Sequence, residues 1–133
     1  MEGLEVTVTQ REATTTSEGR ARQHRVLIDR PAAKGGLDQG AMGGELMLIA
    51  LGGCFMSNLV AAAAARSIAV TGLKVTVRGQ LASAPPRFEQ IALDVEGAAA
   101  DPASLDKLIQ IAERACIVHN TLAPAVTLRV RRI

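Results

Sequence analysis

The stretch LMLIALGGCFMSNLVAAAAA, residues 46–65, contains twenty consecutive residues without a formal charge. That length suffices to cross a bilayer. However, Gly52, Gly53, Ser57 and Asn58 interrupt its centre, and no Trp or Tyr lies at either end. The pattern favours a helix that is apolar on every side because protein covers every side. In so short a chain we expect a second copy to supply part of that cover, which predicts a homodimer and no membrane span.

The segments around this helix show the alternation of apolar and polar residues that is typical of half-buried strands. LEVTVTQ (4–10) and HRVLID (24–29) predict one hairpin. LKVTVRGQLAS (73–83) and FEQIALDVEG (88–97) predict an antiparallel pair, and AVTLRVRR (125–132) predicts a last strand.

Two further segments complete the predicted order of elements. DRPAAKGGLDQGAMGG (29–44) has one Pro, five Gly and no period, which indicates a long loop. DPASLDKLIQIAERAC (101–116) predicts an amphipathic helix with Asp101 as N-cap and Pro102 at its first position. The sequence therefore predicts a single α+β domain over residues 1–133, with a mainly antiparallel sheet.

The charge and the aromatic content of the chain argue against nucleic acid as a partner, and the pattern of the N-terminus favours the cytoplasm. Fifteen Lys and Arg stand against thirteen Asp and Glu, and Phe55 and Phe88 are the only aromatic residues. So small a charge surplus and so few stacking residues argue against a nucleic-acid partner. The N-terminus alternates apolar and polar residues and shows no secretory signal, so we expect a cytoplasmic protein.

The chain has two cysteines, Cys54 within the apolar stretch and Cys116 at the end of the second predicted helix. A buried free cysteine is often only a small hydrophobe, but thiols in a reducing compartment also carry catalysis. Cys54 lies beyond the first helical turn, so a lower pKa would require a cation from elsewhere, such as the arginines between residues 20 and 30. Glu45 falls about 180° around the helix from Cys54 and could serve it only from outside the regular helix. Two Cys and two His without a C-x-x-C spacing argue against a metal site, and we expect no metal or cofactor.

Three segments together resemble a known family, the OsmC/Ohr proteins. ELMLIALGGC (45–54) is similar to the family pattern E-L-L-L-A-A-L-G-G-C, and CIVHNTL (116–122) is similar to C-P-V-H-N-T-L. DRPAAKGGLDQG (29–40) resembles the loop D-x-P-x-x-x-G-G-x-D-x-G. Because Glu45 stands one residue nearer to Cys54 than the Arg-binding Glu of the best-characterised peroxidases, whose position Gly44 occupies, the chain resembles the OsmC-like branch.

The resemblance implies a fold and a reaction. The fold is an intertwined homodimer with mainly antiparallel, curved sheets around two central helices. The reaction is the reduction of organic hydroperoxides by a thiol peroxidase that protects against oxidative stress, with Cys54 as the attacking thiol and Cys116 as the resolving one. A dithiol, lipoyl-type in better-known members, restores both thiols. Arg20 or Arg30 would activate Cys54, and Glu45 would hold the arginine.

One alternative remains open from the residues alone. The same fold without turnover would make a binding protein for a small apolar or thiol-containing ligand. An arginine within reach of Cys54 is the feature that separates the two interpretations.

Overall fold

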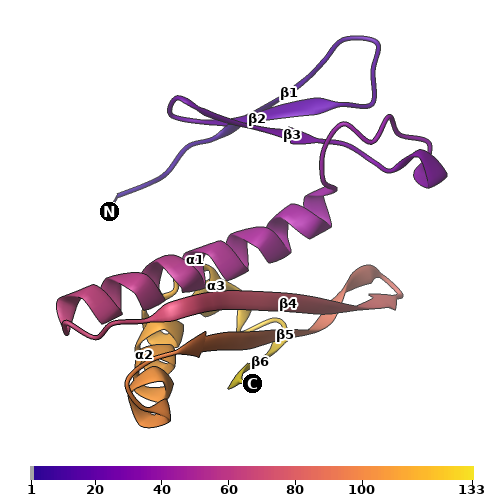
Figure 1. Ribbon diagram of the computed structural model, residues 1–133. Coiled ribbons are helices and arrows are strands. Elements are labelled where there is room, and N and C mark those ends of the chain that lie inside the picture. The colour runs from indigo at the N-terminus through magenta and orange to yellow at the C-terminus, as the bar shows by residue number, and fades with distance from the viewer. Residues whose placement is uncertain (1) are drawn as a thin grey trace. The chain divides into compact units, whose positions relative to one another are not determined.

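The computed structural model describes residues 2–133, which divide into two compact units, residues 2–47 and 48–133 (Figure 1). It has the α+β architecture that the sequence predicts, built from two three-stranded sheets and three α-helices. Helix α1 (Gly43–Ala65) begins in the first unit and continues through the second.

The first unit is an antiparallel meander of three strands, β1 (Thr7–Gln10), β2 (Ser17–Ala21) and β3 (His24–Ile28). The prediction that residues 4–10 pair directly with residues 24–29 is wrong, because β2 lies between them and pairs with both. Its sequence, SEGRA, has no apolar alternation to mark it as a strand. Instead of a large side chain, β2 buries Gly19 against Val26, where an added Cβ would lie 3.0 Å from Val26 Cγ1.

The predicted long loop follows β3 and contains one short 3-10 helix, η1 (Ala32–Lys34). Asp29, only 3% exposed, anchors the loop: its carboxylate accepts hydrogen bonds from the hydroxyls of Thr15 (2.8 Å) and Thr16 (2.7 Å). It also accepts the backbone N–H groups of Arg30 (2.7 Å) and Gln39 (3.3 Å). Although burial raises the pKa of Asp29, these four hydrogen bonds outweigh it and hold the pKa well below that of an ordinary aspartate.

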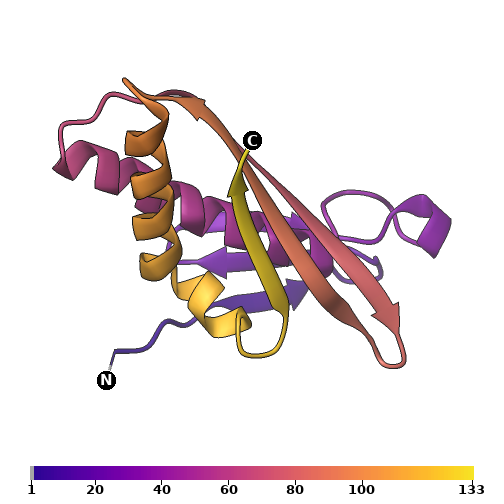
Figure 2. The ribbon, with the colours of Figure 1, turned by 90° about the horizontal axis from the view of Figure 1, so that it is seen from below.

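The second unit contains the rest of α1 and a sheet with the order β4–β5–β6. Strands β4 (Thr71–Ser83) and β5 (Pro86–Ala98) form the predicted antiparallel pair, joined by a two-residue turn. Strand β6 (Thr127–Arg132) is present as predicted but runs parallel to β5 (Figure 2). Three of the four strand pairings among residues 2–133 are thus antiparallel, which confirms the expectation of mainly antiparallel sheets.

Two helices connect β5 to β6. Helix α2 (Pro102–Ala115) begins as predicted, with the Asp101 carboxylate accepting the N–H of Ser104 at 2.7 Å. Helix α3 (Ile117–Leu122), which sequence reasoning did not predict, starts directly after it. Cys116 is the residue between the two helices and caps both. Since parallel neighbours need such a crossover, the two helices explain how β6 reaches the edge of β5.

The core of the second unit lies where α1, α2 and one face of β5 meet. Its fully buried members come from α1 (Leu51, Phe55, Leu59), from alternate positions of β5 (Ile91, Leu93, Val95) and from α2 (Leu105, Leu108, Ala112). Gly52 lets α1 approach β4, because an added Cβ there would lie 2.9 Å from Val77 Cγ2. By length and composition α1 is also apolar enough to span a membrane, with 33% of its most apolar window buried within the chain.

The opposite face of the same sheet buries a carboxylate. Asp94 on β5 is 3% exposed and accepts hydrogen bonds from Arg131 Nε on β6 (2.6 Å) and from Arg78 Nη2 on β4. The hydrogen bonds from Arg131 and Arg78 lower the pKa of Asp94 to about 2. Asp94 thus ties the three strands together across the sheet.

This lowered pKa predicts a loss of stability in acid. The unfolded chain takes up a proton on Asp94 near its ordinary pKa, while the folded chain resists it until about pH 2. The contribution of Asp94 is therefore complete above about pH 4 and is lost as the pH falls toward 2. Urea unfolding at a series of pH values should show this slope, and Asp94→Asn should be less stable at neutral pH and lose less stability on acidification. Equal slopes for the two proteins would contradict the assignment.

Candidate functional site

The structure brings the two cysteines together within the second unit. Cys54 lies on α1 and is half-buried, and Cys116 lies between α2 and α3 with no exposed surface. Both are free thiols, and the thiol of Cys116 donates a hydrogen bond to the sulfur of Cys54. Residues 62 positions apart in the sequence are thus close enough for each thiol to shift the pKa of the other.

Three donors converge on the sulfur of Cys54. Burial of this thiol raises its pKa, but hydrogen bonds from the backbone N–H of Val118, the thiol of Cys116 and the backbone N–H of Ile117 lower it by more. The pKa of Cys54 therefore lies below that of an ordinary cysteine. N–H donors on α3 thus contribute to lowering the pKa of Cys54, an effect for which a nearby cation is expected from the sequence.

The pKa of Cys116 is shifted in the opposite direction, above that of an ordinary cysteine. Its burial raises the pKa, and the hydrogen bond and negative charge of Cys54 raise it further, whereas the N–H groups of His119 and Val118 oppose them. The N–H of His119 lies 3.4 Å from the Cys116 sulfur. Of the two thiols, Cys54 therefore loses its proton more readily, and Cys116 keeps its proton more firmly.

Some residues around the thiols escaped sequence reasoning. Asn58, one helical turn after Cys54, donates to the backbone carbonyl of Cys54 at 2.9 Å, and its Nδ2 lies 3.8 Å from the Cys54 sulfur. Its spacing of four residues on a helix was the available signal. Ile117 and Val118 act through backbone N–H groups, so no side-chain pattern could have indicated them.

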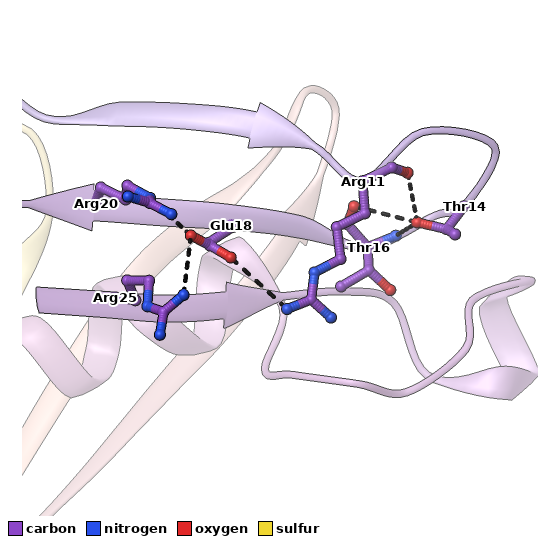
Figure 3. Close-up of polar contacts among 6 residues, drawn as sticks. All are labelled: Arg11, Thr14, Thr16, Glu18, Arg20 and Arg25. Atoms are coloured by element: carbon purple, nitrogen blue, oxygen red, sulfur yellow. Dashed lines mark hydrogen bonds and ion pairs between the residues drawn. The ribbon is translucent and has the colours of Figure 1, made fainter.

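Arg20 lies on β2 of the first unit in a cluster around a single carboxylate (Figure 3). Its Nε donates to Glu18 Oε1 at 2.7 Å, and nitrogen atoms of Arg11 and Arg25 lie 3.6 and 4.0 Å from Glu18 oxygens. The hydrogen bond from Arg20 is the main cause that lowers the pKa of Glu18. Three arginines around one glutamate leave this cluster with a surplus of two positive charges.

Arg30 and Glu45 occupy other places in the first unit. Arg30 follows Asp29 and lines a cavity of about 1050 Å³ together with Lys34 and Ser17. Glu45 lies in the first turn of α1, where its carboxylate accepts the N–H of Met42 at 2.9 Å. Such a bond satisfies a free donor at the start of the helix.

The hydrogen bond from Cys116 to Cys54 predicts a difference between two replacements. Cys116→Ala removes the donor and should raise the pKa of Cys54, whereas Cys116→Ser keeps a hydroxyl donor and should preserve the low value. The rate of alkylation of Cys54 across pH, followed on its peptide by mass spectrometry, reports the pKa. Identical profiles for the Ala and Ser variants would show that this hydrogen bond does not tune Cys54.

The site thus consists of two free thiols, one on α1 and one between α2 and α3, within an α+β chain. A family model for OsmC-like proteins matches residues 36–131 of the chain. The chain therefore belongs to the OsmC-like family. No curated protein matches it in a sequence search.

Solved structures show the same fold at low sequence identity. The chain resembles an OsmC-like protein from Mycoplasma pneumoniae with a TM-score of 0.86 and 19% identity, over 99% of this chain and 96% of that one. An organic hydroperoxide resistance protein from Elizabethkingia anophelis gives a TM-score of 0.73 and 18% identity, over 100% of this chain and 98% of that one. The organic hydroperoxide resistance protein OhrB of Bacillus subtilis gives 0.68 and 16%, over 99% and 98%. The protein therefore shares its fold with proteins named for resistance to organic hydroperoxides.

Proposed function

We propose that the protein is a thiol peroxidase that reduces organic hydroperoxides through Cys54 and Cys116 and so protects the cell against oxidative stress. The observation that carries the proposal is the contact between two free thiols with oppositely shifted pKa values. A purely structural pair of buried cysteines has no need of a stabilised thiolate. The names of several structural neighbours agree with this activity.

The first step uses the thiolate of Cys54. Its sulfur attacks the outer oxygen of the hydroperoxide, the O–O bond breaks, and the alkoxide leaves and takes up a proton to become an alcohol. Cys54 becomes a sulfenic acid. The N–H groups of Ile117 and Val118 favour the charged form of the sulfur before the attack, because they donate to the thiolate.

The second step uses Cys116, whose pKa responds to the first. While Cys54 is charged, its hydrogen bond and its negative charge help to keep the proton on Cys116. Both effects vanish once Cys54 is a neutral sulfenic acid, so Cys116 loses its proton more readily. Its sulfur then attacks the Cys54 sulfur, the S–O bond breaks, and the hydroxide leaves as water. An external dithiol of the lipoyl type reduces the resulting disulfide by thiol exchange.

An arginine completes the proposed site. A guanidinium near Cys54 would further stabilise the thiolate and the leaving alkoxide. Arg20 and Arg30 are the two candidates, and Arg20 is already oriented by Glu18. We propose that Glu45 contributes by fixing the start of α1, through its bond to Met42.

We further propose that the protein works as a cytoplasmic homodimer. Ile49 and Val60 on α1 are 60% and 48% exposed, and Val6 and Val8 in the first unit are 64% and 63% exposed. Burial of these exposed apolar side chains against a second copy of the chain would stabilise a dimer. Light scattering on dilute protein without detergent should give about twice the chain mass of 13.9 kDa. A stable monomer would contradict the proposed assembly.

The activity is tested by counting free thiols before and after treatment with one equivalent of an alkyl hydroperoxide. Both thiols should disappear together, and an intramolecular Cys54–Cys116 disulfide should form that a dithiol reverses. Mass spectrometry under non-reducing conditions identifies the bridge. A protein that leaves the peroxide unreduced while keeping both thiols would be a binding protein with this fold.

A further inference from the structure

The outer face of the β4–β5–β6 sheet carries a second cavity, away from the face that packs against the helices. Its volume is about 410 Å³, and its lining includes Arg78, Ala92 and Arg129. The strand register places these three residues in one row across the sheet, with Ala92 of the central strand between the two arginines. The small side chain of Ala92 leaves room between them.

The spacing of the two arginines suits a single anion. Neighbouring strands lie about 4.8 Å apart, so residues two strands apart are separated by about 10 Å. Two long side chains on one face of the sheet can converge over that distance on a group seated above Ala92. The next row of the cavity adds the side chains of Gln80, Gln90 and Thr127, which are also paired in register. These groups can donate further hydrogen bonds.

The charges on this face are unbalanced. Arg78, Arg129 and Arg131 face one carboxylate, that of Asp94, which leaves a surplus of two positive charges. Asp94 binds Arg78 and Arg131, and Arg129 has no acidic partner within residues 2–133. Farther along the same face, Lys74 lies opposite Glu96, and that pair adds no net charge.

The buried carboxylate also orients one side of the cavity. Asp94 accepts hydrogen bonds from Arg131 and Arg78, and these bonds favour its ionised form. The bond to Asp94 fixes one nitrogen of the Arg78 guanidinium, while the other N–H groups of Arg78 remain available. A guanidinium that is already positioned loses less side-chain entropy when it binds an anion.

We propose that this cavity is a binding site for a small anion with a phosphate or carboxylate group, held between Arg78 and Arg129 above Ala92. Guanidinium groups bind the paired oxygens of both groups through two parallel hydrogen bonds. The site is independent of the thiol chemistry, because it lies on the face of the sheet opposite the core that holds Cys116.

The test is a calorimetric titration of the reduced protein with inorganic phosphate and, separately, with acetate. Arg129→Ala should weaken binding about tenfold, which corresponds to about 1.4 kcal/mol. Ala92→Glu should abolish binding, because its carboxylate would occupy the space between the arginines. Arg132→Ala is the matched control: it removes the same charge from the same strand, but Arg132 faces α2 and binds Asp106.

Each outcome decides the proposal. Saturable binding of phosphate or acetate that Arg129→Ala weakens and Arg132→Ala leaves unchanged supports it, and the better-bound probe identifies the preferred acidic group. Equal weakening by the two arginine replacements, or equal competition by chloride, would show only a general attraction of anions and overturn it. An absence of saturable binding of both probes would overturn it as well. Circular dichroism establishes that each variant is folded, and the Arg129→Ala and Arg132→Ala pair decides if Ala92→Glu does not fold.

Discussion

Cys54→Ser is expected to abolish the consumption of organic hydroperoxide, so that peroxide in its presence decays only as fast as in buffer. The hydroxyl of serine stays protonated at neutral pH, and the reaction requires a thiolate. Cys116→Ser should still react once with peroxide and stop at the sulfenic acid on Cys54, because no second thiol is available. The measurement is peroxide loss over time, with a sulfenic-acid trap followed by mass spectrometry.

The two serine variants test the attacking role of Cys54 and the resolving role of Cys116 separately. If Cys116→Ser also turned over peroxide repeatedly with a dithiol, Cys116 would not be the resolving residue, although Cys54 would remain the attacking one. If Cys54→Ser consumed peroxide as fast as the parent protein, the reactive group would lie elsewhere and the proposed mechanism would fail. Both serine variants keep the size of the side chain, so packing changes should be small.

The largest effect on stability is expected for Leu108→Ala. Leu108 on α2 has no exposed surface and lies in the core of the second unit. Removing its side chain loses the transfer free energy of the buried methyl and methylene groups and leaves a cavity. The free energy of unfolding should fall by about 2–5 kcal/mol, as measured by urea unfolding of the reduced protein.

Leu81→Ala provides the matched control for this prediction. Leu81 on β4 is 68% exposed, so the same substitution should cost less than about 1 kcal/mol. Similar losses for the two variants would mean that Leu108 is not part of the stabilising core or that a partner covers Leu81.

The parts of the fold with a regular hydrophobic period could be predicted from the sequence. The apolar stretch predicted α1, the alternation predicted β4 and β5, and Asp101 and Pro102 predicted the start of α2. Strand β2 could not be predicted in this way, because its residues are mostly small or charged and do not alternate between apolar and polar. It is held in place by its backbone pairing with β1 and β3. The parallel direction of β6 depends on the length of the crossover and not on any residue within the strand.

The site was predictable as far as side chains define it. The positions of Cys54 and Cys116 in two recognisable segments indicated a thiol pair, and in the structure each thiol shifts the pKa of the other. The N–H donors of Ile117 and Val118 were not predictable, because any residue carries such a group and only the turn at Cys116 directs them toward Cys54. The bond between Arg20 and Glu18 depends on β2, which the sequence pattern did not indicate.

The parallel pairing of β6 with β5 has a consequence for the order in which the chain is made. Residues 127–132 form β6 and leave the ribosome after the β4–β5 hairpin, which is synthesised well before them. During that interval one edge of β5 has no neighbour, and Asp94 lacks the hydrogen bonds of Arg131. An unpaired strand edge invites association with other chains. Slower elongation just before residue 127 would therefore favour aggregation of the nascent protein, whereas a completed β6 covers that edge of β5.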